Sequence, residues 1–269
     1  MLTLVLATLM SQPPPKFSIS PSFVIENNQR PARLLPRMIA VPKRQRMQGN
    51  SVLADIVNAC DGINQPSLDH SRKTNGHETT HMVQANMRNK HGGRVNAFYL
   101  LDGNGVILKE PGIAKRMVQR FVPPSLRKSR YETYVSGQTA WDDQPLYLVD
   151  EWNAYINGTL VAIDDKENGV YDGNERSDEA VGPVEMGVYC VALGMAVEKH
   201  DPEYWHGEPE FKSFLQYEWQ RAKECFDKAA PLFPWDTQDE IIKSLRTSPD
   251  AEAMRQFIKT HLNGVWLNP

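Results

Sequence analysis

Apolar side chains recur at steps of three and four residues along most of the chain, which is the spacing of one face of an α-helix. The pattern is clear after Ser51, where Val52 and Ile56 share a face and Ser51 is placed to cap the helix. Two glycines at 92–93 predict the end of a second helix, which runs from about His77 to His91. Further helices are expected at about 112–122, 125–134, 145–163, 208–229, 237–246 and 250–262, with a loop at 164–177.

Two segments depart from this amphipathic helical pattern. Residues 184–197 (VEMGVYCVALGMAV) are apolar on nearly every face, which predicts a helix in the centre of the core, with Glu185 as its unusual residue. Residues 95–101 and 106–109 are apolar runs on either side of Asp102-Gly103-Asn104-Gly105, and this arrangement predicts a β-hairpin. The expected fold class is therefore mainly α (α+β), a helical domain with one β-hairpin.

The first 50 residues differ in composition from the rest. Residues 1–10 (MLTLVLATLM) are uncharged and apolar, which resembles the core of a secretory signal without its basic leader or, alternatively, a short docking segment. The first interpretation predicts a secreted or periplasmic protein, and otherwise we expect a cytoplasmic one. Residues 11–50 are basic and interrupted by prolines, so they predict an extended arm. We divide the chain into this N-terminal part, 1–50, and one domain, 51–269.

Composition excludes several classes of protein. The 269 residues carry a net charge of −3 and are 41% hydrophobic, which is ordinary for a globular protein. No nucleic-acid binding is expected, because the basic side chains of the arm lack interleaved aromatics and no recognition fold follows. No run of about 18 apolar residues is present, so no membrane span is expected. The three cysteines are too few and too scattered for a disulfide framework.

The candidate chemistry is concentrated in His77-Glu78-Thr79-Thr80-His81, an H-E-x-x-H sequence. On a helix, histidines four residues apart lie one turn apart on the same face, so His77 and His81 can bind one metal ion. Zinc suits this pair, because it takes nitrogen and oxygen ligands tetrahedrally and keeps one position for water at catalytic sites. Zinc lowers the pKa of that water to about 7, and Glu78 is placed to accept its proton as the general base.

A third ligand must come from elsewhere in the chain. The metzincin form of the motif requires glycine and histidine where this sequence has Gln84 and Met87, so that class is excluded. Glu151, 70 residues after His81 and on an expected helix, is the preferred candidate. The alternatives are Glu110, Glu132 and Glu185. The residues expected to accept a hydrogen bond from the free nitrogen of a ligand histidine are Asp150, Asn153 and Glu185.

The H-E-x-x-H helix, followed by a distant D-E-aromatic-x-A segment (DEWNA), resembles the gluzincin zinc metallopeptidases related to anthrax lethal factor and the Pro-Pro endopeptidases. The resemblance covers roughly residues 70–165 and implies a mostly helical, zincin-like endopeptidase domain. It also implies that His77, His81 and Glu151 are zinc ligands and that Glu78 is the general base.

Relatives of this kind use a tyrosine seven residues before the ligand glutamate to stabilise the oxyanion, but this sequence has Gln144 there. Tyr147 is the first substitute, because it lies one turn before Glu151 on the same helix face. Tyr134 and Tyr131, from the preceding segment, are the other candidates. A well-placed phenol that donates a hydrogen bond to the oxyanion contributes about 3 kcal/mol.

The sequence therefore predicts a zinc-dependent metalloendopeptidase, a hydrolase that cleaves peptide bonds with a zinc-activated water. Its partner is then a peptide or protein substrate. The alternative is a non-catalytic metal-binding or scaffolding domain with a zincin-like fold. The two hypotheses differ in whether Glu78 matters beyond metal affinity.

Overall fold

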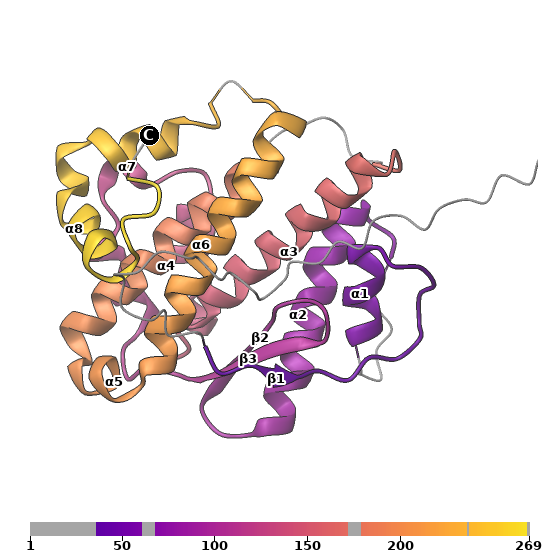
Figure 1. Cartoon of the computed structure of the whole chain (residues 1–269). Helices are drawn as coiled ribbons and strands as arrows, with labels where there is room; N and C mark the ends of the chain where they lie inside the picture. The colour runs from indigo at the N-terminus through magenta and orange to yellow at the C-terminus, as the bar shows by residue number, and fades with distance from the viewer. Residues whose placement is uncertain (1–35, 61–67, 172–178, 236, 268–269) are drawn as a thin grey trace, which may run out of the picture.

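The structure, a computed structural model, describes residues 36–60, 68–171, 179–235 and 237–267 (Figure 1). Residues 1–10, on which export was predicted, and the arm up to residue 35 lie outside the described residues. Helices make up 64% and strands 6%, so the mainly α class is confirmed. The helices are α1 (Val52–Ala59), α2 (Arg72–His91), α3 (Tyr147–Glu167), α4 (Val181–His200), α5 (Pro202–Gly207), α6 (Pro209–Leu232), α7 (Glu240–Thr247) and α8 (Glu252–His261).

A small antiparallel sheet lies against α2. The expected hairpin is confirmed, with β2 (Val95–Tyr99) paired to β3 (Asn104–Lys109). A third strand, β1 (Ile39–Ala40), comes from the end of the arm and pairs with the other edge of β3, which gives the strand order β1-β3-β2. Strand β1 was not predicted, because prolines at 36 and 42 flank this short segment and proline is disfavoured within a sheet.

Helix α2, which carries the H-E-x-x-H motif, is longer than expected. It begins at Arg72 instead of near His77, because the Ser71 hydroxyl caps it by accepting a hydrogen bond from the Thr74 amide (3.4 Å). His77 therefore lies inside a formed helix, where the backbone on both sides holds it in place.

Residues 110–146, between β3 and α3, contain no α-helix. The α-helices expected at 112–122 and 125–134 are therefore wrong. Pro123 and Pro124 remove two consecutive amide donors, so the segment cannot be one continuous helix, and the carbonyl oxygens of residues 134, 135 and 137 are bonded by the Lys115 side chain. The chain instead forms 3₁₀ turns at Lys115–Phe121, Pro124–Leu126 and Thr139–Trp141, and a π-helical turn at Tyr131–Ser136.

The end of α3 replaces part of the expected loop at 164–177. Asp165 accepts two hydrogen bonds from the Arg72 guanidinium of α2, both 2.8 Å long. Asp164 accepts a hydrogen bond from the Val52 amide at the start of α1 (3.0 Å). These carboxylates are buried, and they bind the end of α3 to α1 and α2.

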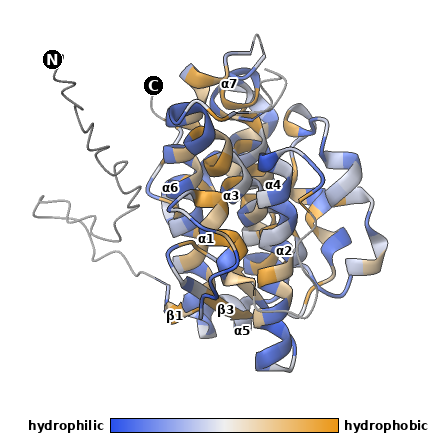
Figure 2. Cartoon of the chain, turned by 90° about the vertical axis from the view of Figure 1, so that its right-hand side faces the viewer, coloured by the Kyte–Doolittle hydropathy of each residue, from blue (hydrophilic) through white to orange (hydrophobic). Residues whose placement is uncertain are grey.

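Helix α4 is the central core helix that its sequence predicted. Its most apolar window has a mean hydropathy of 1.3, enough by length and composition to cross a membrane, but 83% of that window is buried inside the fold. Gly187 lets α4 approach the rings of Trp152 and Trp219, since an added Cβ would lie 2.9 Å from the Trp219 ring. Apolar positions gather between the helices and hydrophilic positions cover the outside (Figure 2).

Helices α2 and α3 approach each other closely at two glycines. A Cβ at Gly76 of α2 would lie 2.7 Å from Cγ2 of Val161 in α3. A Cβ at Gly158 of α3 would lie 3.3 Å from Cβ of His77. A Cβ atom at either position would require its neighbour to shift. The backbone of each helix at its glycine therefore packs directly against a side chain of the other helix.

We predict that Gly76→Ala destabilises the protein by about 1–3 kcal/mol, because overpacking outweighs the gain in helix propensity. Val161→Ala removes the clashing methyl group, so the double variant should recover part of this loss. Urea unfolding of the wild type, both single variants and the double variant measures the coupling. Stabilisation by Gly76→Ala alone would show that the helices are not in close contact here.

Candidate metal centre

Helix α2 presents both motif histidines on the face that packs against α3. The Nε2 atoms of His77 and His81 are 3.1 Å apart, and the rings meet edge to face with centroids 4.8 Å apart. The two side chains are 14% and 24% exposed, so the pair is reachable from solvent on one side. A water molecule or substrate can therefore approach the two histidines from that side.

Glu151, near the start of α3, joins this pair. Its Oε2 atom lies 3.6 Å from Nε2 of His77 and 3.5 Å from Nε2 of His81. Tetrahedral zinc bonds of about 2.0–2.2 Å place neighbouring ligand atoms about 3.3–3.6 Å apart. Oε2 of Glu151 is buried and has no hydrogen-bond donor, a cost that a cation at the point shared by the three atoms would remove. The three residues could therefore hold a metal ion.

The Glu151 carboxylate carries the charge that a metal ligand needs. Burial by itself raises its pKa, but the attraction of the nearby imidazoles of His77 and His81 outweighs burial and lowers the pKa to about 2. The group is therefore anionic at neutral pH, next to two imidazoles.

Asp150 orients one of the two histidines. Its Oδ2 atom accepts a hydrogen bond from Nδ1 of His81, so in the neutral ring the lone pair lies on Nε2. The other oxygen, Oδ1, accepts a hydrogen bond from the Gln84 side-chain amide (2.8 Å). Asn153, expected in the same role, does not contact a histidine; it donates to Gln84 and to the Tyr99 carbonyl (2.9 Å).

Glu78 follows His77 on α2, and its side chain is exposed. Within the described part of the chain, no residue donates a hydrogen bond to its carboxylate or forms an ion pair with it. The carboxylate directly after His77 in the sequence is therefore not engaged by any described residue.

Three tyrosines surround the ligand set. Tyr147 lies one turn before Glu151, and burial, followed by the Glu151 charge, raises the pKa of its phenol. The Tyr134 hydroxyl lies 3.0 Å from that of Tyr155, whose ring meets His77 edge to face with centroids 4.8 Å apart. Sequence reasoning missed Tyr155, although its place one turn after Glu151 is the same helical signal that selected Tyr147.

Two buried charged side chains hold the π-helical turn that carries Tyr134. Lys115, 1% exposed, donates hydrogen bonds to the carbonyl oxygens of residues 134, 135 and 137 (3.0, 3.1 and 2.7 Å). Glu185 accepts hydrogen bonds from the Arg130 amide (2.7 Å) and guanidinium (2.9 Å). Glu185 therefore takes neither role predicted for it, as a metal ligand or as a partner of a ligand histidine. The importance of Lys115 was missed.

The other alternative ligands also lie outside the His77, His81 and Glu151 group. Glu132 is exposed, and Tyr131 packs against Tyr189 with ring centroids 6.1 Å apart. Glu110 is buried beneath the start of α3, where Oε2 accepts a hydrogen bond from the Leu146 amide (3.0 Å) and Oε1 has no partner. Burial is the main reason that the pKa of Glu110 is raised to about 7.

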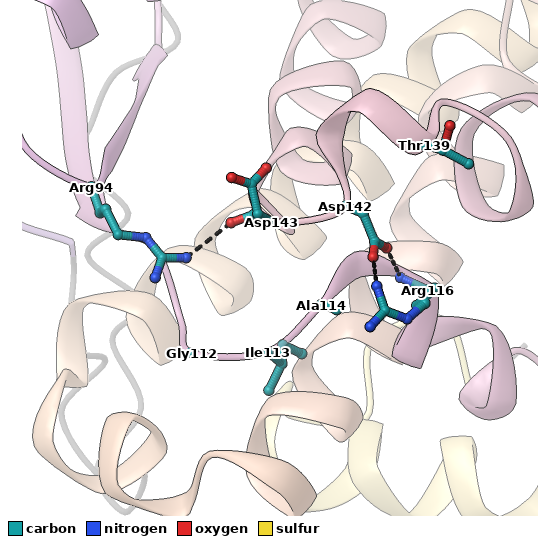
Figure 3. Close-up of a pocket in the computed structure, with 8 residues that line it drawn as sticks. All are labelled: Arg94, Gly112, Ile113, Ala114, Arg116, Thr139, Asp142 and Asp143. Atoms are coloured by element: carbon teal, nitrogen blue, oxygen red, sulfur yellow. Dashed lines mark hydrogen bonds and ion pairs between the residues drawn. The ribbon is translucent and has the colours of Figure 1, made fainter.

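A hollow of about 480 Å³ opens beside the start of α3 (Figure 3). Asp142 joins its walls, because its carbonyl and carboxylate oxygens accept hydrogen bonds from the amides of Lys115 and Arg116, each 2.7 Å long. Next to it, Trp141 stacks on Tyr147 with centroids 5.3 Å apart. None of the predicted site residues lines this hollow.

Comparison of the chain with protein-family models, with curated proteins and with solved structures finds no match. The likeness to the gluzincin peptidases rests on two sequence segments, the H-E-x-x-H motif and the segment around Glu151. The fold brings the metal-binding atoms of both segments to one point.

We predict that Glu110 makes stability depend on pH. Because burial raises its pKa from 4.5 to about 7, the folded chain binds a proton in this range that the unfolded chain has released. Its contribution to stability is therefore lost as the pH rises through this range. Relative to wild type, Glu110→Gln should gain about 1–3 kcal/mol between about pH 5 and about pH 8.

Thermal unfolding across this pH range measures the effect. Glu203→Gln, at an exposed position of α5, is the control and should show no such gain. A difference between Glu110→Gln and wild type that stays constant with pH would contradict the prediction.

Proposed function

We propose that this chain is a zinc-dependent metalloendopeptidase with the ligand arrangement of the gluzincins. The observation that carries the proposal is the convergence of three atoms, Nε2 of His77, Nε2 of His81 and Oε2 of Glu151, with separations of 3.1, 3.6 and 3.5 Å. Catalytic zinc sites use three protein ligands and keep a fourth position open, whereas structural sites are closed by four. The described residues supply three, and the histidines face solvent on one side.

Each residue of the centre has a role in the proposed reaction. A zinc ion bound here supplies a Lewis acid that polarises the scissile carbonyl and makes water more acidic. Glu78 takes the proton of the attacking water and returns it to the leaving amine. Tyr147 and Tyr134 both stay protonated, because burial raises their pKa values, so either phenol can donate a hydrogen bond to the oxyanion.

The exposed carboxylate of Glu78 favours hydrolysis over the alternative function. A non-catalytic metal-binding or scaffolding domain needs His77, His81 and Glu151 but gives Glu78 no role. In H-E-x-x-H sites the glutamate that follows the first ligand histidine is the general base, and the carboxylate of Glu78 is not engaged elsewhere among the described residues. The proposed substrate is a peptide bond in a peptide or protein.

Metal analysis of the purified protein tests the ligand set. We expect one zinc ion per chain in the wild type and loss of zinc in His77→Ala and in Glu151→Ala, because each removes one of three protein ligands. His91→Ala is the matched control, since His91 lies on the same helix but bonds the Met87 carbonyl (2.8 Å). Absence of zinc from the wild type, or its retention in both ligand variants, would refute the site.

The role of Glu78 is tested with Glu78→Gln. We expect full zinc content and a loss of peptide hydrolysis of about 10²–10⁴-fold, because the amide cannot accept the proton. The assay is cleavage of a degenerate peptide library followed by mass spectrometry. Glu132→Gln, at an exposed position of the π-helical turn, should retain activity. A zinc-loaded wild type that cleaves nothing would support the metal-binding scaffold instead.

A further inference from the structure

A buried chain of side chains connects the metal centre to α6. Nη1 of Arg221 in α6 donates to Oδ1 of Asn153 (2.8 Å), and Nδ2 of Asn153 donates to Oε1 of Gln84. Nε2 of Gln84 donates to Oδ1 of Asp150 (2.8 Å), whose other oxygen accepts from Nδ1 of His81. The three residues furthest from the centre, Arg221, Asn153 and Gln84, are all buried, so each of these groups depends on its protein partners.

Each amide in this chain has only one orientation that satisfies its partners. A guanidinium only donates, so Asn153 must turn its oxygen toward Arg221. The Tyr99 carbonyl only accepts, and it meets Nδ2 of Asn153 at 2.9 Å, which requires the same orientation. Gln84 must then turn its oxygen toward Asn153, and the Tyr99 amide donates to that same oxygen (3.3 Å). The nitrogen of Gln84 is thereby directed at Asp150.

We propose that Arg221, Asn153 and Gln84 are positioning residues that set the tautomer of His81. The donor from Gln84 occupies one oxygen of Asp150 and turns the other toward Nδ1 of His81, so the neutral ring keeps its proton on Nδ1. Nε2 then presents its lone pair to the point that His81 shares with the other ligands. This inference rests on the proposed function, because it assigns the chain a purpose at the metal centre.

Asn157 provides a matched comparison within the same network. It lies one turn after Asn153 on α3 and is as deeply buried, and its Oδ1 also accepts a hydrogen bond from Arg221. Its Nδ2 donates to the Tyr99 carbonyl (2.9 Å) and to the Thr80 hydroxyl (3.3 Å). Asn157 therefore shares the guanidinium and carbonyl partners of Asn153 but has no bond to Gln84.

The substitutions Asn153→Asp and Asn157→Asp separate a positioning role from a structural one. Both are isosteric and place a carboxylate against Arg221, but a carboxylate at 153 cannot donate to Gln84. Gln84 then turns its nitrogen toward 153 and its oxygen toward Asp150, which removes the donor from Asp150 and gives up the longer bond from the Tyr99 amide (3.3 Å). Chelator competition should show zinc affinity reduced by about 10–100-fold in Asn153→Asp and changed by less than about threefold in Asn157→Asp.

The tautomer is measured directly from the ¹⁵N shifts of the His81 ring in the metal-free protein. We expect Nδ1–H in the neutral ring of the wild type and of Asn157→Asp, and a substantial Nε2–H population in Asn153→Asp. Equal losses of zinc affinity in the two variants, or an unchanged His81 tautomer in Asn153→Asp, would overturn the proposal.

Gln84→Met removes the donor to Asp150 without adding charge, and it keeps the test decisive if Asn153→Asp does not fold. We expect this variant to increase the Nε2–H population of His81 and to lower zinc affinity. An unchanged His81 tautomer in this variant would also overturn the proposal. Because the ¹⁵N measurement uses no metal, it distinguishes the two proposals. A wild type that binds no zinc but shows the expected tautomers would refute the proposed function alone.

Discussion

The close approach of α2 and α3 is the constraint on which the rest of the structure depends. The two imidazoles belong to α2 and the carboxylate to α3, so the separation between these helices sets whether the ligand atoms can meet. Gly76 and Gly158 allow a contact that any side chain would widen. The same contact brings Gln84 of α2 within hydrogen-bond distance of Asp150. The distance between α2 and α3 therefore sets the separation of the ligand atoms. It also sets whether Gln84 can donate a hydrogen bond to Asp150.

Charged and amide side chains are placed in the interior where the backbone or the site needs support. Burying such groups is costly unless each finds partners, and a fully paired network instead rigidifies its surroundings. Lys115 satisfies carbonyl oxygens that the irregular turn around Tyr134 leaves without helical donors. Arg221 pairs with Glu218 (3.1 Å) while it orients two asparagines of α3. Oε2 of Glu151 is among the buried side-chain atoms that have no hydrogen-bond partner, as is Oε1 of Glu110.

Helical periodicity was sufficient for the long elements, because an apolar face that packs on a core repeats every turn whatever its neighbours are. The buried helix α4 and the hairpin were predicted from other local signals, a segment that is apolar on nearly every face and two apolar runs on either side of a turn. The π turn of residues 131–136 was not, because carbonyl oxygens of its backbone are satisfied by a lysine side chain and not by a repeating pattern. Strand β1 was missed because its partner lies more than sixty residues away in the sequence.

For the candidate site, motif spacing identified His77 and His81, since both lie on one helix and their relation is local. The choice of Glu151 over Glu185 depended on how α3 and α4 rotate about their axes, and no single-helix pattern contains that information. The same rotation decides that Tyr155 lies over His77 and that Asn153 faces Arg221. The part of the site that could not be predicted from the sequence is therefore how the helices are rotated and packed relative to one another.

The pairing of β1 with β3 has a consequence for the behaviour of the protein in concentrated solution. An unpaired edge strand offers a row of amide and carbonyl groups to other chains and promotes edge-to-edge aggregation. Ile39, Ala40 and the amide of Val41 cover the β3 edge beside the hairpin turn with residues of the same chain. The end of the basic arm thus acts as an intramolecular edge protector, and proteolytic trimming that reached it would expose this edge to self-association.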